Sequence, residues 1–144
     1  DSWHEDLQAW IQFVRADKTS PCPSIARITP FLSMGLRFTD DIAITELNAL
    51  WRQTPKKTDV ISFPALDESI VLPEDQCVEL GDIVVSVPSA EFQAKEHNHG
   101  LLKELRWLVC HGLLHLFGWD HPNSKRLNEM LNYQEQLLSI SVKI

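Results

Sequence analysis

The segment from His111 to His121 constrains the fold most, because its spacing suits a helix that is followed by a turn. It reads HGLLHLFGWDH, so three histidines lie within eleven residues and Gly118 separates the second from the third. In a helix over residues 101–117, His111 and His115 are four residues apart and project from the same face. Gly118 can take the left-handed conformation that ends a helix, which lets the chain turn back. The pattern therefore predicts that His121 joins the other two imidazoles at one point.

Three converging imidazoles predict a metal site. Three neutral histidines with a fourth position left open are the ligand set of a catalytic zinc ion. We therefore expect one zinc ion per chain on His111, His115 and His121, although nickel, copper or iron could use the same ligands. A lone histidine on an apolar helix is usually a core or surface residue, but the third histidine and the glycine weigh against that interpretation here. Asp120 could orient a ligand histidine or be an ordinary turn carboxylate, and the sequence leaves both open.

Length, composition and charge narrow the class of protein. The chain has 144 residues, of which 44% are hydrophobic, which predicts a single domain over residues 1–144. A net charge of -7 argues against a general nucleic-acid coating protein but permits a small basic site. The three cysteines form no CxxC pair, which predicts neither a disulfide framework nor a thiolate zinc cluster and fits a reducing compartment. Charged residues interrupt the apolar segment 101–119, so we expect no membrane span.

Hydrophobic periodicity and turn residues predict an α+β fold, with a small mixed sheet packed against several helices. Polar and proline-rich segments predict loops at residues 19–24 and 53–57 and a long irregular excursion over residues 65–80. The expected strands are residues 36–38, 59–63 and 81–87. The expected helices are residues 2–15, 40–52, 89–97 and 101–117, with a last amphipathic helix after Pro122 and Asn123.

The sequence resembles the YbeY family of endoribonucleases, whose hallmark is HGxLHLxGxDH. Residues 111–121 keep every fixed position of this hallmark. Further matches are ELNALWR at residues 46–52, KTDVISFP at 57–64 and LGDI at 80–83, so the likeness runs from about residue 36 to the end. The chain departs from the family after Arg52, where Gln53 to Lys56 replace the usual Gly-Lys-Asp. Members also usually carry a strand ahead of the first helix, so either residues are missing here or the sheet has one strand fewer.

The resemblance implies a metal-dependent endoribonuclease that cuts single-stranded RNA in ribosomal RNA processing and ribosome quality control. It implies ribosomal RNA as substrate, ribosomal proteins or a ribosome-associated GTPase as partners, and the bacterial cytoplasm or an organelle stroma or matrix as location. By similarity Arg52, Asp82 and His111 are the functional residues. Arg52 could hold two phosphate oxygens, and Asp82 could accept a proton or align water. Without the resemblance, Arg52 would be a cation at a helix end and Asp82 a carboxylate at a strand edge.

Other polar residues are weaker candidates for contact with RNA. Lys56 and Lys57 follow Arg52 and could form a local basic strip, although most loop lysines are only solvated. Ser62 lies on the next expected strand and could touch substrate. Trp119 could stack on a base. His97 and His99 could bind metal, but an exposed pair of turn histidines is the favoured interpretation.

Two other functions are weighed against the nuclease. The histidine spacing is also that of the metzincin zinc proteases, but Gly112 stands where their HExxH motif has its glutamate, so a zinc peptidase would need another carboxylate. A non-catalytic ribosome-assembly factor with a structural metal is the third hypothesis. For the nuclease, the sequence leaves open whether metal-activated water or the 2′-hydroxyl of RNA is the nucleophile.

Overall fold

The predicted α+β class is confirmed in a computed structural model that describes residues 2–66 and 77–140. Within these residues the chain forms a sheet of three strands and six helices. The strands are β1 (Leu32–Thr39), β2 (Val60–Pro64) and β3 (Val78–Ser86). The helices are α1 (Ser2–Ala16), α2 (Ser24–Ile28), α3 (Asp41–Arg52), α4 (Val87–Glu96), α5 (Leu101–Leu116) and α6 (Ser124–Ser139).

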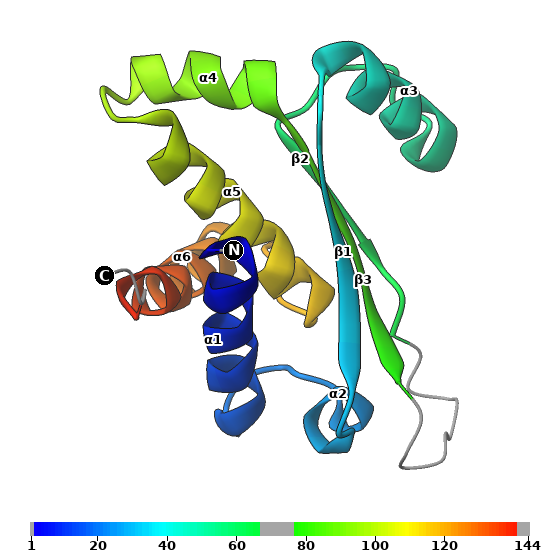
Figure 1. The fold of residues 1–144 in the computed structure, drawn as a ribbon, viewed down its shortest axis with the longest axis vertical. Helices are drawn as coiled ribbons and strands as arrows, with labels where there is room; N and C mark the ends of the chain where they lie inside the picture. The colour runs from blue at the N-terminus through cyan, green and yellow to red at the C-terminus, as the bar shows by residue number, and fades with distance from the viewer. Residues whose placement is uncertain (1, 67–76, 141–144) are drawn as a thin grey trace.

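The sheet is mixed, and helices lie on both of its sides. Its strand order is β1-β3-β2, with β1 parallel and β2 antiparallel to the central strand. Figure 1 shows α1, α5 and α6 on one side of the sheet, α3 on the other side, and α4 across one end. The two faces of β2 and β3 therefore meet different helices, which decides where each of their side chains can act.

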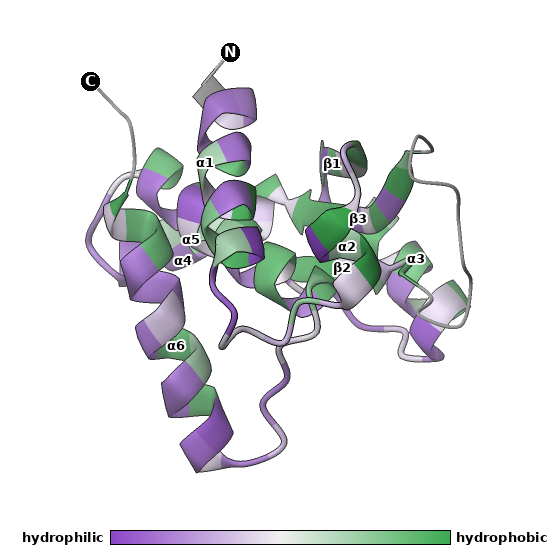
Figure 2. Cartoon of the chain, turned by 90° about the horizontal axis from the view of Figure 1, so that it is seen from below, coloured by the Kyte–Doolittle hydropathy of each residue, from purple (hydrophilic) through white to green (hydrophobic). Residues whose placement is uncertain are grey.

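The main core lies between the sheet and the layer of α1, α5 and α6. Helix α5 supplies the fully buried Leu108, Leu113 and Leu114, and α1 supplies Trp10 and Val14 at the helical spacing seen in the sequence. Figure 2 shows these apolar segments turned inward and the hydrophilic ones outward. Arg106 of α5 also donates to Asp6 of α1 at 3.2 Å. This packing holds α5 firmly against the sheet.

At Gly112, helix α5 lies close against the sheet. A Cβ atom at this position would lie 2.9 Å from Cγ2 of Ile83 and 3.0 Å from the hydroxyl oxygen of Ser62. The Ser62 hydroxyl donates to the Gly112 carbonyl at 3.0 Å, so β2 is tied to α5 at the same point. Because Ile83 is fully buried, it has no room to move aside. A side chain at residue 112 would therefore force its neighbours to shift.

Strand β3 is longer than the sequence predicts. We expected residues 65–80 to be irregular and the strand to begin at Gly81, but the strand begins at Val78, so the first expectation is wrong for residues 78–80. The pairing with β1 passes from Ser33–Glu79 to Met34–Gly81 and skips Leu80, which forms a bulge. Gly81 has a φ of +137°, which a strand accepts at a bulge because glycine lacks a side chain. Residues 67–76 of the expected excursion lie outside the described residues.

Three further boundaries differ from the expectations. Strand β1 begins at Leu32, well before the predicted residue 36, and the short helix α2 was not predicted. Helix α4 begins at Val87, because Pro88 lies in its first turn, where a missing N–H costs nothing. The sequence instead predicts that Pro88 ends the strand expected at residues 81–87.

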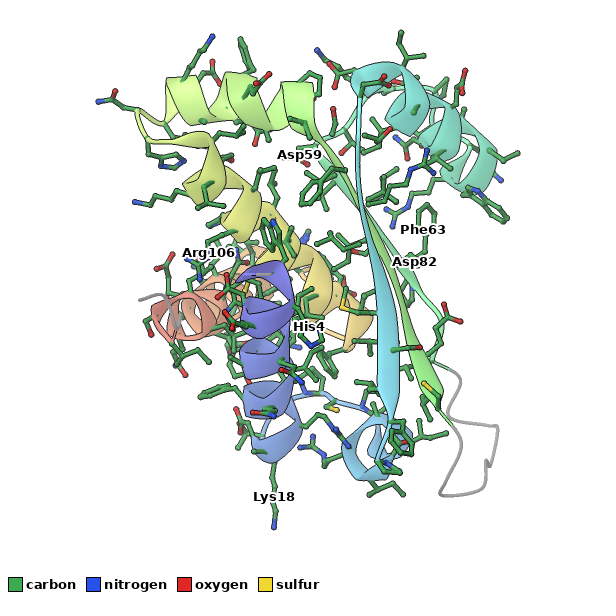
Figure 3. The ribbon with its side chains drawn as sticks, in the orientation of Figure 1. His4, Lys18, Asp59, Phe63, Asp82 and Arg106 are labelled. Atoms are coloured by element: carbon green, nitrogen blue, oxygen red, sulfur yellow. The ribbon has the colours of Figure 1, made fainter. Side chains whose placement is uncertain are left out.

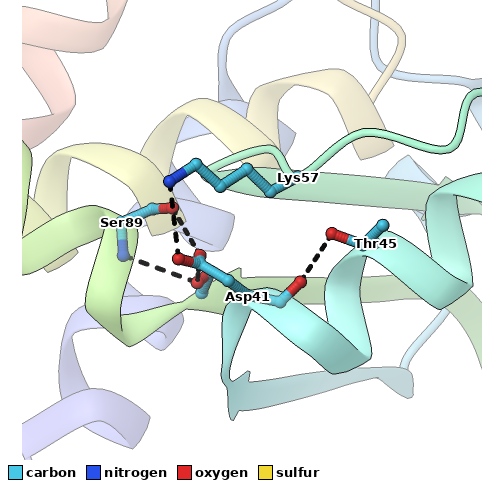
Figure 4. A network of polar contacts seen from close by, with 5 residues as sticks. Asp41, Thr45, Lys57 and Ser89 are labelled. Carbon is cyan, nitrogen blue, oxygen red and sulfur yellow. Dashed lines mark hydrogen bonds and ion pairs between the residues drawn. The ribbon is translucent and has the colours of Figure 1, made fainter.

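Helix α3 is held at its start by a network of polar contacts. The Asp40 side chain accepts from the Ala43 amide and caps the helix. The Asp41 carboxylate accepts from the hydroxyls of Ser86 and Ser89, and the Lys57 ammonium lies 3.7 Å away (Figure 4). These serine hydrogen bonds, with a smaller contribution from Lys57, lower the pKa of Asp41 below its ordinary value. The network fixes α3 to the junction of β3 and α4.

None of the helices in residues 2–66 and 77–140 has the length and apolar character needed to cross a membrane. All three cysteines are free thiols. Cys110 is fully buried, and burial raises the pKa of its thiol, as expected for a small hydrophobe in the core.

The close approach at Gly112 gives a first prediction. Gly112→Ser places a side chain against Ile83 and Ser62, and we expect it to lower the free energy of unfolding by about 1–3 kcal/mol. Gly100→Ser is the matched control, because a Cβ at Gly100 meets no atom within 4 Å and serine is a good helix N-cap. Urea denaturation of both variants measures the difference. Equal stability of the two variants would contradict the tight contact.

Candidate metal centre and its cavity

Helix α5 and the turn after it bring the three predicted histidines together. His111 and His115 lie on one face of α5, and His121 lies in the turn that precedes α6. Gly118 makes this turn with a φ of +112°. The three side chains offer ligand atoms that all lie within 4.8 Å of one another. The predicted convergence of the three imidazoles is therefore confirmed.

Hydrogen bonds fix which nitrogen of His111 is free. Nε2 of the Gln134 amide donates to the carbonyl of Trp107 at 3.1 Å, so its Oε1 is left as an acceptor. That Oε1 lies 2.9 Å from Nδ1 of His111, which must therefore carry the proton. Gln134 is fully buried, so this orientation is enforced by the core. His111 is left with an unprotonated Nε2 that faces the other histidines.

A hydrogen bond also fixes which ring nitrogen of His115 carries the proton. Its Nδ1 donates to the Trp119 carbonyl at 2.9 Å, so its Nε2 is also unprotonated. The two Nε2 atoms lie 3.2 Å apart, with no proton available to join them. Two lone pairs this close repel each other unless a cation lies between them.

This arrangement fits a bound transition-metal ion. A tetrahedral zinc ion with bonds of about 2.0–2.1 Å places neighbouring ligand nitrogens about 3.3 Å apart. The separation of the His111 and His115 nitrogens is close to that value. His121, which is exposed, would complete three ligands and leave a position open towards solvent. The partner groups Gln134 and the Trp119 carbonyl are the outer hydrogen-bond acceptors that metal-binding histidines normally have.

The environment also keeps the ligands neutral. Burial lowers the pKa of His111, and the nearby His121 adds to this effect, while the Gln134 hydrogen bond opposes it. Burial likewise lowers the pKa of His115, and neighbouring His111 adds to it. A lowered pKa means that both imidazoles are unprotonated at neutral pH, which is the form that binds a metal.

The three histidines open onto a cavity of about 650 Å³ between β2 and α5. Arg52, at the end of α3, lines the same cavity, so the structure joins it to the metal centre across the loop of residues 53–57. Its Nη2 donates to the Ser62 carbonyl at 2.8 Å, which anchors one side of the guanidinium and leaves other N–H groups available. Helix α3 ends here because Gln53, where the family usually has glycine, turns left-handed with a φ of +53°.

Asp59 is a carboxylate of this cavity that the sequence did not single out. It lies just before β2, lines the cavity with His111, and acts to raise the pKa of that histidine. Its Oδ2 accepts from Gln93 of α4 at 2.9 Å, and the Thr58 hydroxyl approaches its Oδ1 at 3.5 Å. The aspartate in the KTDVISFP segment was visible in the sequence, but only the fold shows that it faces the histidines.

Asp82 does not join the histidines. Ile83 points towards α5, and strand alternation therefore turns Asp82 to the face that α3 covers. It lines a separate hollow there with Phe63, Gly35 and Arg37, and Figure 3 shows Asp82 and Phe63 on the side of the sheet away from α5. The expected group of Arg52, Asp82 and His111 is therefore divided between the two faces of the sheet.

The predicted substrate contacts are also divided. Lys57 directs its ammonium towards Asp41 and lines a hollow beside α3, away from the histidines. Lys56 is exposed and is not among the residues that line the metal cavity. Ser62 lines the metal cavity, but it is 7% exposed and its hydroxyl already donates to the Gly112 carbonyl. The two lysines therefore do not line the metal cavity, and the hydroxyl of Ser62 is engaged by the backbone of α5.

The neighbouring aromatic and acidic residues take definite places. Trp107 stacks on His111 with ring centroids 5.0 Å apart, and it lines the cavity. Trp119 instead packs against Tyr133, with Arg126 over its ring. The Asp120 carboxylate accepts from the His121 amide at 2.8 Å, which is the turn role left open by the sequence. The sequence did not identify Gln134 as a partner of His111. Its place among the apolar residues of α6 was the available signal, because a buried amide needs hydrogen-bond partners.

Comparisons with known proteins show what this chain is similar to. A family model described as Endoribonuclease YbeY matches residues 2–141. An Endoribonuclease YbeY of Prochlorococcus marinus (strain MIT 9313) is 64% identical over 99% of this chain and 76% of its own length. One of Parasynechococcus marenigrum (strain WH8102) is 56% identical over 95% of this chain and 74% of its own. The solution structure of TM1509 from Thermotoga maritima is similar with a TM-score of 0.55 and 25% identity, covering 94% of this chain and 79% of that one.

The hydrogen bond from His111 to Gln134 gives a second prediction. Gln134→Ala removes the acceptor that holds the His111 ring, and we expect the dissociation constant for zinc to rise about 10–100-fold. Competition with a chromophoric zinc chelator measures this constant. Gln136→Ala, on the exposed side of the same helix, is the control and should leave it unchanged. Unaltered affinity in a folded Gln134→Ala protein would show that Gln134 does not support the ligand.

Proposed function

The chain belongs to the Endoribonuclease YbeY family, and from this premise we propose that it is a metal-dependent endoribonuclease acting on single-stranded RNA. Membership of the family makes it an RNA-cleaving hydrolase. The three histidines support the metal dependence, and the residues that line the cavity support a single-stranded substrate.

One observation carries the proposal: Arg52 and the three histidines share a single cavity. Cleavage of a phosphodiester requires a cation that can hold phosphate oxygens and stabilise the additional negative charge of the transition state. Arg52 meets this need, since its guanidinium is anchored at Nη2 by the Ser62 carbonyl and keeps further N–H donors. The local sequence does not place Arg52 near the histidines, because its position depends on how α3 and β2 pack together.

His111, His115 and His121 would hold the metal, with zinc as the proposed ion. When bound, a zinc ion supplies positive charge next to the phosphate and can lower the pKa of a water molecule. Trp107, stacked on His111, gives the cavity an apolar wall against which a base could lie. A base that is unpaired can stack in this way, whereas a base within a duplex cannot, which favours a single-stranded substrate.

We assign to Asp59 the proton-accepting role that the sequence gave to Asp82. The reaction forms a bond from an oxygen nucleophile to phosphorus and releases a ribose oxygen, so one proton must leave the nucleophile and one must reach the leaving group. Asp59 lies in the cavity, and Gln93 holds one of its oxygens while the other is only weakly engaged. Asp82 lines a separate hollow on the face of the sheet that α3 covers. We therefore propose that it acts outside the reacting centre.

The two alternative functions are not favoured. A peptidase of the HExxH type carries a glutamate at the position of Gly112, where a Cβ would lie 2.9 Å from Ile83 and 3.0 Å from Ser62, and the curated relatives of this chain are named endoribonucleases and not peptidases. A purely structural metal would need no arginine beside an open ligand position. The curated relatives of the chain are also named endoribonucleases, and not assembly factors. We propose ribosomal RNA as the substrate, ribosomal proteins or a ribosome-associated GTPase as partners, and the bacterial cytoplasm or an organelle stroma or matrix as location, following the resemblance.

The shared cavity gives a third prediction. His111→Ala should lose the zinc ion of the cavity and RNA cleavage, whereas Arg52→Ala should keep the zinc ion of the cavity and lose cleavage about 100-fold or more, because it removes charge stabilisation alone. The assay uses a labelled single-stranded ribosomal RNA fragment, with zinc content measured on the same samples. Lys57→Ala is the control and should cleave normally. Full cleavage by a folded Arg52→Ala protein would refute the role of the arginine.

A fourth prediction separates the two aspartates. Asp59→Asn should slow cleavage about 100-fold with zinc binding retained, since an amide cannot accept the proton. Asp82→Asn should have an effect of less than about threefold at the same step, given that a mutation outside the reacting centre leaves its electrostatics unchanged. Single-turnover cleavage of the same RNA measures both. The reverse order of effects would return the catalytic assignment to Asp82.

A further inference from the structure

A second group of metal-ligand side chains lies at the turn between α4 and α5. Nδ1 of His97 and Nε2 of His99 approach the same oxygen of Glu104, its Oε1, at 3.0 and 2.6 Å. The three residues offer ligand atoms within 4.8 Å of one another. The sequence favoured an exposed pair of turn histidines, but the structure directs both rings towards one buried carboxylate.

The backbone holds the two histidines in this arrangement. His97 closes α4 by donating its amide to the Gln93 carbonyl at 2.8 Å, and the His99 amide donates to the Ala94 carbonyl at 3.0 Å. Asn98 between them takes a left-handed conformation with a φ of +60°. This residue reverses the chain so that both imidazoles lie over the first turn of α5, where Glu104 is found.

The charge of Glu104 lacks a permanent counter-ion among the described residues. Its side chain is 4% exposed, and its ion-pair partners there are His97 and His99, with no lysine or arginine. Burying a carboxylate is costly unless a positive charge compensates it. A neutral imidazole donates a hydrogen bond but carries no charge of its own, whereas a divalent cation held by the two imidazoles would supply positive charge to the carboxylate.

We propose that His97, His99 and Glu104 form a second site for a divalent transition metal, with zinc the best match, which fixes the turn between α4 and α5. Two imidazoles and one carboxylate are a ligand set that zinc accepts. Each imidazole would move its proton to the nitrogen that faces away from the ion. The His97 side chain is 58% exposed, so water can fill the remaining coordination positions.

This site is separate from the cavity that contains Arg52. Glu104 and His111 are seven residues apart on α5, which corresponds to about 10 Å along the helix axis. One ion therefore cannot share ligands from both groups. The second site goes beyond the proposed nuclease function, and its test needs no RNA.

The test counts zinc ions per chain. The full chain is stripped with a chelator, saturated with zinc, desalted and measured by elemental mass spectrometry, and we expect two ions. His111→Ala/His115→Ala should retain one. Adding His97→Ala to this background should remove it, whereas adding His4→Ala, which changes a histidine outside both groups, should not. His97 is the residue of choice because its side chain is largely exposed, so its loss is tolerated by the core.

A thermal measurement gives an independent reading of the same site. In the His111→Ala/His115→Ala background, zinc at tenfold excess over its dissociation constant should raise Tm by about 5 °C, and His97→Ala should abolish the shift. Glu104→Gln should abolish it as well if the protein folds. One zinc ion in the unmodified chain, with none and no shift of Tm in the double variant, would overturn the proposal and leave a hydrogen-bonded triad.

Discussion

The contact between α5 and the sheet at Gly112 is the constraint on which the metal centre depends. The absence of a side chain lets α5 lie directly against Ile83, and the Ser62 hydroxyl closes the contact through the Gly112 carbonyl. With α5 in this position, His111 and His115 face the space beside β2 instead of the core. Gly112, at the position of the protease glutamate, therefore serves the packing of α5 on the sheet.

The electrostatics of the cavity explain how an acidic chain can act on RNA. The chain has a net charge of -7, and the cavity contains Asp59 and Asp120 with Arg52 as its cation among the described residues. The bound metal proposed for the three histidines would reverse this balance locally, so that a phosphate is attracted only where it can be cleaved. Neutral ligand histidines, kept so by burial, make that attraction depend on the metal.

The placement of the acidic residues depends on strand geometry that a short motif does not encode. The LGDI segment correctly predicted a strand, but neighbouring residues of a strand face opposite ways, and the bulge at Leu80 shifts which residue faces which side. Asp82 consequently faces α3, while Asp59, at the start of the neighbouring strand, lies in the metal cavity. Lys57 likewise lies at a hollow beside α3, with its ammonium 3.7 Å from the Asp41 carboxylate.

The sequence by itself determined the ligand set of the metal centre, since the spacing of His111 and His115 and the left-handed turn at Gly118 follow from the local geometry of one helix and its end. It also determined the α+β class, because hydrophobic periodicity is a local property. Only the tertiary structure decided that Arg52 and Asp59 share the cavity, that Gln134 holds His111, and that Asp82 lines a hollow on the other face of the sheet. The reason is that these contacts join elements far apart in the chain, so they depend on strand register and on which helix covers which face of the sheet.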